Sequence, residues 1–126
     1  MPPSSPTPSP SSLLHRFASL PADTPMPLLK RRRIIGAQAM ISHITLSKGC
    51  NVPMHAHENE QFAIVLTGRL RFTLGHPGAE QTLTVSAGEV LHLPGNLPHA
   101  AFAEEDSIVL DVFSPPSAMT GIDRKS

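Results

Sequence analysis

The stretch Met54–Gly68, MHAHENEQFAIVLTG, places two histidines directly before an apolar run. His55 and His57 are two residues apart, so on an extended strand their side chains point to the same face. Two neutral imidazoles on one face can share a metal ion. The third ligand is Glu60 or Gln61. A regular strand gives Gln61 the parity of the histidines, whereas a bulge just before it would favour Glu60.

A fourth ligand candidate lies in the segment GEVLHLPGNLPHA, residues 88–100. Pro94 ends an apolar strand, and Pro94–Asn96 forms a turn that folds the chain back. His99 therefore starts an antiparallel strand and brings a distant imidazole toward the same cavity. His43 and His92 also lie on predicted strands, where each is expected to be a buried, hydrogen-bonded histidine or to line the pocket.

Short β-segments with Gly, Pro and Asn between them continue on both sides of these histidines, and no convincing helix interrupts them. This pattern predicts an all-β sandwich or barrel. Residues 1–30 begin with a Pro/Ser-rich run and are expected to form a disordered or weakly structured tail. We expect the barrel to span 31–117, with a C-terminal tail at 118–126. The predicted strands are 39–46, 61–68, 69–75, 81–88, 89–94, 99–105 and 107–113.

Composition excludes several classes of protein. The chain has 126 residues, with ten Lys plus Arg and ten Asp plus Glu, and this zero net charge argues against nucleic-acid binding. No apolar run is long enough to span a membrane. Cys50 is the single cysteine, so no internal disulfide forms and a reducing compartment is tolerated. We expect a cytoplasmic protein with a small-molecule substrate. The basic run Lys30–Arg33 is interpreted as a solvated lead-in to a strand rather than an anion patch.

The two histidine segments together resemble the motifs of the cupin superfamily. In the first motif Gln replaces the usual Glu, and in the second Asn replaces the usual Gly. The resemblance implies a double-stranded β-helix, or jelly-roll barrel, that holds one divalent metal ion per chain, with Ni, Fe, Mn or Zn as candidates. It also implies a homodimer formed by pairing of sheet edges. The matching residues are Gly49, His55, His57, Gln61, Gly68, Gly88, Pro94, Asn96 and His99, of which His55, His57, Gln61 and His99 would be the ligands.

Asp111 interrupts the apolar strand SIVLDVF, residues 107–113. A carboxylate there is costly unless it is paired or faces a polar cavity, and it shares a face with Phe113. It is either an edge or loop-facing residue or an acid/base group beside the metal. With the HAHENEQ motif, the segment LDVFSPP is similar to the KdgF branch of small cupins. By resemblance, Asp111 and Phe113 match active-site positions there. The Arg that follows Ser-Pro-Pro in that branch is Ser117 here.

Three functions are compatible with these features. The KdgF branch takes its name from a pectin-degradation protein that opens 4,5-unsaturated uronates, so the resemblance implies a metal-dependent lyase or isomerase for sugar-acid-like molecules. The alternatives are a dioxygenase of the quercetinase type and a non-catalytic small-molecule-binding cupin. An Arg would bind a uronate carboxylate in bidentate fashion, and Ser117 cannot do so.

Overall fold

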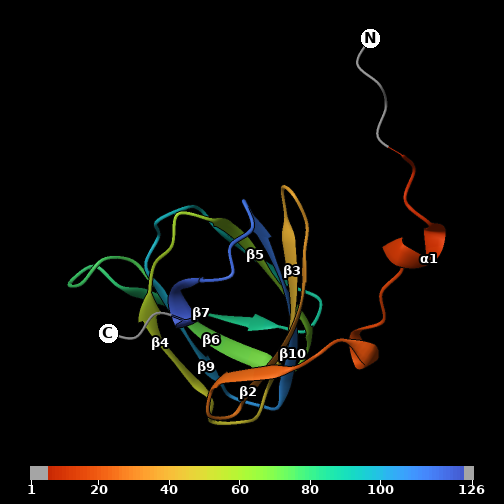
Figure 1. Ribbon diagram of the computed structural model, residues 1–126. Helices are drawn as coiled ribbons and strands as arrows, with labels where there is room; N and C mark the ends of the chain where they lie inside the picture. Colours follow the sequence, from red (N-terminus) through yellow and green to blue (C-terminus); the bar gives the residue numbers. More distant parts are fainter. Residues whose placement is uncertain (1–5, 124–126) are drawn as a thin grey trace.

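Ten strands in two antiparallel sheets form most of the computed structural model, which describes residues 6–123 (Figure 1). The six-stranded sheet has the order β1-β2-β3-β10-β5-β8, and the four-stranded sheet has the order β4-β9-β6-β7. This arrangement confirms the predicted all-β jelly-roll barrel. The strands are β1 (Asp23–Met26), β2 (Leu29–Ile35), β3 (Met40–Leu46), β4 (Asn51–His55), β5 (Glu60–Thr67), β6 (Arg69–Leu74), β7 (Gln81–Ser86), β8 (Val90–Leu93), β9 (His99–Ala103) and β10 (Ser107–Ser114).

The core lies between the two sheets, because alternate residues of each strand point inward. In β3, for example, Met40, Ser42, Ile44 and Leu46 are buried, while the residues between them are more exposed. The core residues are Leu29, Ile44, Leu46, Cys50, Val52, Ala63, Val65, Leu70, Phe72, Val85, Ala103 and Val109.

Four residues of the motifs, Gly49, Gly68, Gly88 and Asn96, have positive φ, and two of them are decisive for their turns. Gly68 joins β5 to β6 with φ of 88°, and a Cβ at this position would overlap Ser107. Only glycine fits such a site without strain. Asn96, which stands where the motif has Gly, has φ of 67°. Asn tolerates this conformation better than other residues with a Cβ, so the turn keeps its shape.

The N-terminal region holds two short helices, α1 (Pro10–Leu13) and the 3-10 helix η1 (Phe17–Ser19). Residues 6–9 and α1 are exposed, whereas the Phe17 ring packs on His43 of β3 with centroids 4.7 Å apart. The first five residues of the predicted tail lie outside the described residues. No helix in the described part of the chain is long and apolar enough to cross a membrane.

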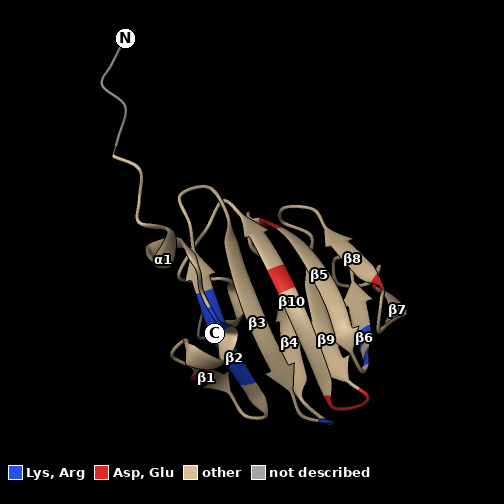
Figure 2. Ribbon diagram, turned by 90° about the vertical axis from the view of Figure 1, so that its right-hand side faces the viewer, with Lys and Arg blue, Asp and Glu red and all other residues tan. Residues whose placement is uncertain are grey.

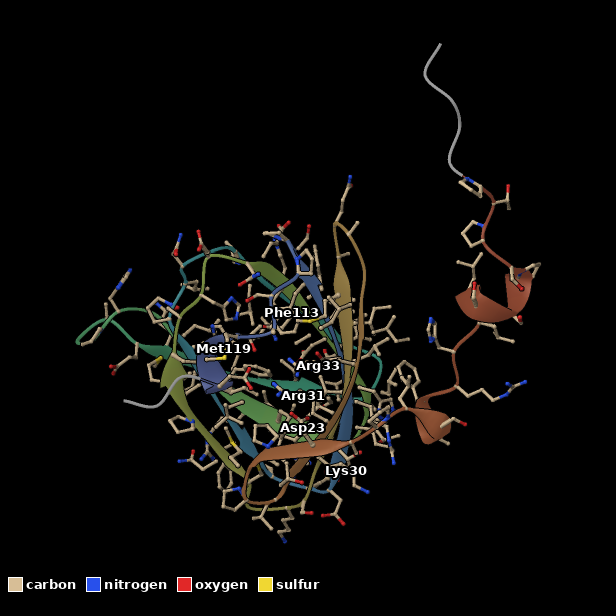
Figure 3. The ribbon with its side chains drawn as sticks, viewed as in Figure 1. Asp23, Lys30, Arg31, Arg33, Phe113 and Met119 are labelled. Atoms are coloured by element: carbon tan, nitrogen blue, oxygen red, sulfur yellow. The ribbon has the colours of Figure 1, made fainter. Side chains whose placement is uncertain are left out.

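Arg31 is buried, so the prediction of a solvated basic run is wrong at this position. Its guanidinium bonds Asp23 at 2.6 Å and Asp123 at 2.7 Å, and these two carboxylates compensate the burial of its charge. Figure 3 labels Arg31 and Asp23. The sheet therefore begins at Asp23, upstream of the predicted boundary at residue 31. The 3-10 helix η2 (Gly121–Asp123) extends the ordered structure beyond residue 117.

Candidate metal centre

Three imidazoles converge at one end of the barrel. His55 is the last residue of β4, His57 lies in the following loop, and His99 opens β9 directly opposite His55 in register. One nitrogen from each ring lies within 4.8 Å of the others, and the ring centroids of His55 and His99 are 4.2 Å apart. These three residues could hold a metal ion, and they are three of the four predicted ligands.

Backbone carbonyls set the tautomer of all three rings. The Nδ1–H groups donate to the carbonyl of Pro53 from His55 at 2.8 Å, of Asn59 from His57 at 3.0 Å, and of Leu97 from His99 at 2.8 Å. A carbonyl can only accept, so each Nδ1 carries the proton and each Nε2 keeps its lone pair. The Nε2 of His99 is buried without a hydrogen-bond partner. Such outer hydrogen bonds orient the histidine ligands of metal sites.

Gln61, the predicted fourth ligand, turns toward the same point. Its Oε1 lies 3.0 Å from the Nε2 of His57, and its amide also hydrogen-bonds Asp111. The amide nitrogen of Gln61 donates to the Asp111 carboxylate, so Oε1 is the atom that lies beside the lone pair of His57. Two acceptor atoms at this distance are stabilised by a shared cation. Glu60 points outward and bonds His92 at 2.6 Å, as the parity of a regular strand predicts.

Burial favours the neutral form of two of the three imidazoles, those of His55 and His99. Burial lowers the pKa of His99 to about 4, with a smaller contribution from the nearby His55. Burial also lowers the pKa of His55 below its ordinary value. A metal ion binds neutral imidazole, so at neutral pH no proton has to leave these ligands first. The donor set of three imidazole nitrogens and one amide oxygen therefore fits a divalent metal ion.

Asp111 and Phe113 lie beside this centre on β10, on the inward face. In register Phe113 is opposite Gln61, and its ring meets that of His57 edge-on with centroids 5.5 Å apart. The Oδ1 of Asp111 is buried and has no hydrogen-bond partner. Burial raises the pKa of Asp111 to about 7, and the Gln61 amide lowers it in part. Asp111 is thus a cavity-facing carboxyl, not an edge or loop-facing one.

A cavity of about 70 Å³ opens next to the three imidazoles. Apart from the histidines, Gln61 and Asp111, its wall is almost wholly apolar, and none of the described residues that line it is Lys or Arg. Thr120 and Ile122 close one side, while Gly121 lies so near His55 that a Cβ there would overlap the ring. No motif in residues 118–126 predicts this C-terminal contribution. The lining residues are Leu29, Ile44, Leu46, Val52, His55, His57, Gln61, Leu70, Phe72, His99, Ala101, Val109, Asp111, Phe113, Thr120 and Ile122.

The other two strand histidines lie outside the cavity. His43 faces outward under the Phe17 ring, and its Nδ1 has no partner, so it is not the hydrogen-bonded histidine that was expected. His92 is exposed rather than buried. It bonds Glu60 and stacks on Phe62 with centroids 4.6 Å apart. Both residues lie at outward-facing positions of their strands. The alternation in these two strands does not by itself show which positions face inward.

Solved structures share this architecture. KdgF from Halomonas sp. is 27% identical, the match covers 77% of this chain and 89% of that chain, and the TM-score is 0.66. An RmlC-like cupin from Shewanella frigidimarina is 24% identical over 82% of this chain and 91% of that chain, with a TM-score of 0.72. A variant of oxalate decarboxylase from Bacillus subtilis is 22% identical, with a TM-score of 0.71. That match covers 78% of this chain but only 28% of the decarboxylase chain. The last two likenesses support the fold alone.

No curated protein matches the chain. The family model of the cupin domain, however, matches residues 42–113, which include every candidate ligand together with Asp111 and Phe113. This match agrees with the barrel, with the two glycine-bounded histidine motifs and with the solved structures above. The chain belongs to the cupin family.

Proposed function

We propose that this protein is a metal-dependent enzyme of the lyase or isomerase type that moves a proton on a small, oxygen-bearing substrate. The observation that carries the proposal is the Asp111 carboxyl. It faces the cavity with an unpartnered, buried Oδ1, and its pKa of about 7 lets it gain or lose a proton near neutral pH. General acids and bases work best when their pKa lies near the working pH.

His55, His57, Gln61 and His99 would hold the metal ion. None of the four is a carboxylate or a thiolate, so a divalent ion would keep its full charge and act as a Lewis acid toward an oxygen of the substrate. Other groups of the protein position the ligands and the Asp111 carboxyl. The backbone carbonyls bonded to the Nδ1 atoms fix the three rings. The Gln61 amide orients the Asp111 carboxyl toward the cavity.

Phe113 and the apolar wall exclude water from the reacting groups. Phe113 packs edge-on against His57 and is buried. In a dry cavity a carboxyl group exchanges its proton with the substrate instead of with solvent. Asp111 would accept a proton from one atom of the substrate and return it to another, which is the net change in an isomerisation.

Unsaturated uronates are the first substrate class to test, because of the similarity to KdgF. Two features differ from what such a substrate requires. Ser117 bonds only the backbone of Met119, and the lining residues offer no guanidinium for a carboxylate. The cavity of about 70 Å³ is also smaller than the roughly 150 Å³ that accommodates benzene.

The apolar wall favours a second candidate function. A dioxygenase acting on a small, weakly polar molecule would use the same histidines and the open positions of the metal, and it would need no carboxylate clamp. The two functions differ in what they require of Asp111, since only proton transfer depends on a titrating group at that position.

The test starts with elemental analysis of protein purified without an affinity tag, followed by a screen of unsaturated uronates with the metal identified. Asp111→Asn should retain metal and lose turnover by roughly 10²- to 10⁴-fold, while Glu80→Gln, which alters an exposed carboxylate, should match the wild type. Full metal content in a His55→Ala/His57→Ala double variant would reject the metal site. If neither the wild type nor Ser117→Arg converts any unsaturated uronate, the uronate proposal is rejected.

A further inference from the structure

The cavity beside the three imidazoles has a polar end and an apolar end. At the polar end, the Oδ1 of Asp111 and the Nε2 of His99 are buried and find no hydrogen-bond partner among the described residues. Asp111 is the only charged residue of β10, where it appears as a red band in the middle of the strand (Figure 2). The apolar end is formed by residues of both sheets and of η2: Leu29, Ile44, Leu46, Val52, Leu70, Phe72, Ala101, Val109 and Ile122.

Strand register separates the two ends along the barrel. In the four-stranded sheet, Leu70 lies four residues along β6 from Leu74, the residue opposite His99. In the six-stranded sheet, Val109 lies two residues along β10 from Asp111. A strand advances about 3.3 Å per residue, so the lining extends about 13 Å from the level of His99 and about 7 Å from the level of Asp111. The cavity therefore leads from the candidate metal ligands into the apolar interior of the barrel.

The apolar end offers no side-chain partner to water. Its nine residues carry only hydrocarbon side chains, and a buried water needs roughly two to four polar partners, so this part of the cavity stays dry. Dry apolar cavities bind apolar molecules, and one of roughly 150 Å³ accommodates the six carbons of benzene. By proportion, the cavity of about 70 Å³ accepts an apolar group of about three carbons.

A sugar acid fits such a cavity poorly. It carries a hydroxyl on most of its carbons, and each hydroxyl that enters the apolar end loses its hydrogen bonds to water. Among the described lining residues, Thr120 alone has a hydroxyl group, and its Oγ1 already bonds Asp123 at 3.3 Å. The polar groups that remain, Gln61, Asp111 and the histidines, are sufficient for one oxygen-bearing end of a substrate.

We infer that the substrate has one oxygen-bearing end and one apolar end of about three carbons, as a short-chain ketone or 2-oxo acid has. The oxygen-bearing end would lie beside Asp111 and the metal ion, and the apolar end would fill the space lined by Val109, Ile44 and Phe72. This inference rests on the proposed function, because it takes the metal ion and the acid/base role of Asp111 as given. An unsaturated uronate, with its several hydroxyls, does not meet this description.

Binding of straight-chain carboxylates to the cobalt-loaded protein, followed by the visible absorption of Co(II), tests the inference. The probes run from formate to hexanoate. The affinity of the wild type should rise about fourfold with each added CH₂ group as far as butyrate, because each one leaves water for the apolar end. It should then fall, because a longer chain overfills the cavity. 3-Hydroxybutyrate, which adds one hydroxyl to butyrate, should bind roughly tenfold more weakly than butyrate.

Two variants of lining residues should shift this optimum in opposite directions. Val109→Ala enlarges the cavity and should move the optimum to a longer acid than butyrate. Ala101→Val reduces the cavity and should move the optimum to a shorter acid, with the affinity for formate unchanged. The matched control is Val85→Ala, since Val85 is 4% exposed and Val109 3%, but Val85 does not line the cavity. Its optimum should remain at butyrate.

Far-UV circular dichroism establishes that each variant is folded, and if one cavity variant does not fold, the other gives the answer. An affinity that is independent of chain length overturns the inference. So does an optimum that stays at butyrate in the folded cavity variants, or one that shifts equally in Val85→Ala. Equal binding of butyrate and 3-hydroxybutyrate also overturns it. Conversion of an unsaturated uronate by the wild type would overturn the inference while supporting the proposed function.

Xenon binding to the metal-free protein separates the cavity from the metal chemistry. Xenon enters dry apolar cavities, and its binding is followed by the NMR signals of methyl groups. If the wild type takes up no cobalt, the proposed function fails, and the xenon titration decides on the apolar site. Shifts at Val109 and Ile44 that are absent at Val85 support this site, and no shift at the lining residues overturns it.

Discussion

Replacing Asp111 by Asn should change how the stability of the metal-free protein depends on pH. The folded pKa of Asp111 is about 7 against an ordinary value of 3.8, a difference of about three units. Each unit is about 1.4 kcal/mol, so the ionised carboxylate lowers the stability of the metal-free fold by about 4 kcal/mol. The pKa is raised by folding, so the folded state binds more protons between about pH 4 and pH 7. Stability contributed by the protonated form is therefore lost as pH rises through that window.

The amide of Asn does not titrate, so Asp111→Asn removes this dependence. Burying an amide adds its own cost of about 1–3 kcal/mol, which is the same at every pH. At about pH 4.5 the wild type has lost only about 1 kcal/mol and at about pH 8 about 4 kcal/mol. The stability of Asp111→Asn relative to the wild type should therefore increase by about 3 kcal/mol between those two values. All other titrating groups are the same in both proteins, so their contribution to the pH dependence cancels in the difference between the two.

Urea denaturation of chelator-treated protein, followed by far-UV circular dichroism, measures this difference; the chain has no Trp or Tyr to report by fluorescence. Glu80→Gln is the matched control, because it makes the same change from carboxylate to amide on an exposed side chain, and a constant offset from the wild type is expected of it. A constant offset for Asp111→Asn as well would refute the reasoning. It would mean that Asp111 ionises in the folded protein as easily as in the unfolded chain.

Two further predictions concern the C-terminal segment. Asp123→Ala should lower the free energy of unfolding by about 3 kcal/mol because it uncovers part of the buried charge of Arg31. Asp23→Ala should cost about 1 kcal/mol, since the Asp23 side chain is 50% exposed against 12% for Asp123; equal losses in denaturation curves would contradict this order. Gly121→Ala should weaken metal binding roughly tenfold by displacing the His55 ring. Unchanged affinity in titration calorimetry would show that the ring does not depend on this contact.

The sequence was sufficient to predict the barrel and which side chains meet at the candidate metal centre. Both rest on local rules. Strand parity turns Gln61 inward and Glu60 outward, and the turn at Pro94–Asn96 returns His99 to a position opposite His55. His57 is an exception, because strand parity does not place it. Strand β4 ends at His55, and the loop that follows directs the His57 ring.

The parts that could not be predicted depend on contacts between distant segments. Arg31 looks like any residue of a basic run until Asp123, 92 positions later, lies beside it. Thr120 and Ile122 line the cavity only because η2 packs against β4. For His92, parity alone does not say which face of a strand is inner, and the Glu60 partner that settles the question comes from another strand.

The ion pair between Arg31 and Asp123 ties the C-terminal segment to the barrel, whereas the arm before Phe17 is exposed. The two ends of the chain therefore differ as attachment points for a label or a fusion partner. Only three residues would separate Asp123 from a fusion partner joined after Ser126, and the segment of Asp123 forms part of the cavity wall. A label at the other end would be separated from the barrel by the exposed arm before Phe17 (Figure 1). Immobilisation, fluorescent labelling and purification handles should therefore be placed at the N-terminal end. A handle at the C-terminal end would be expected to alter the very site under study.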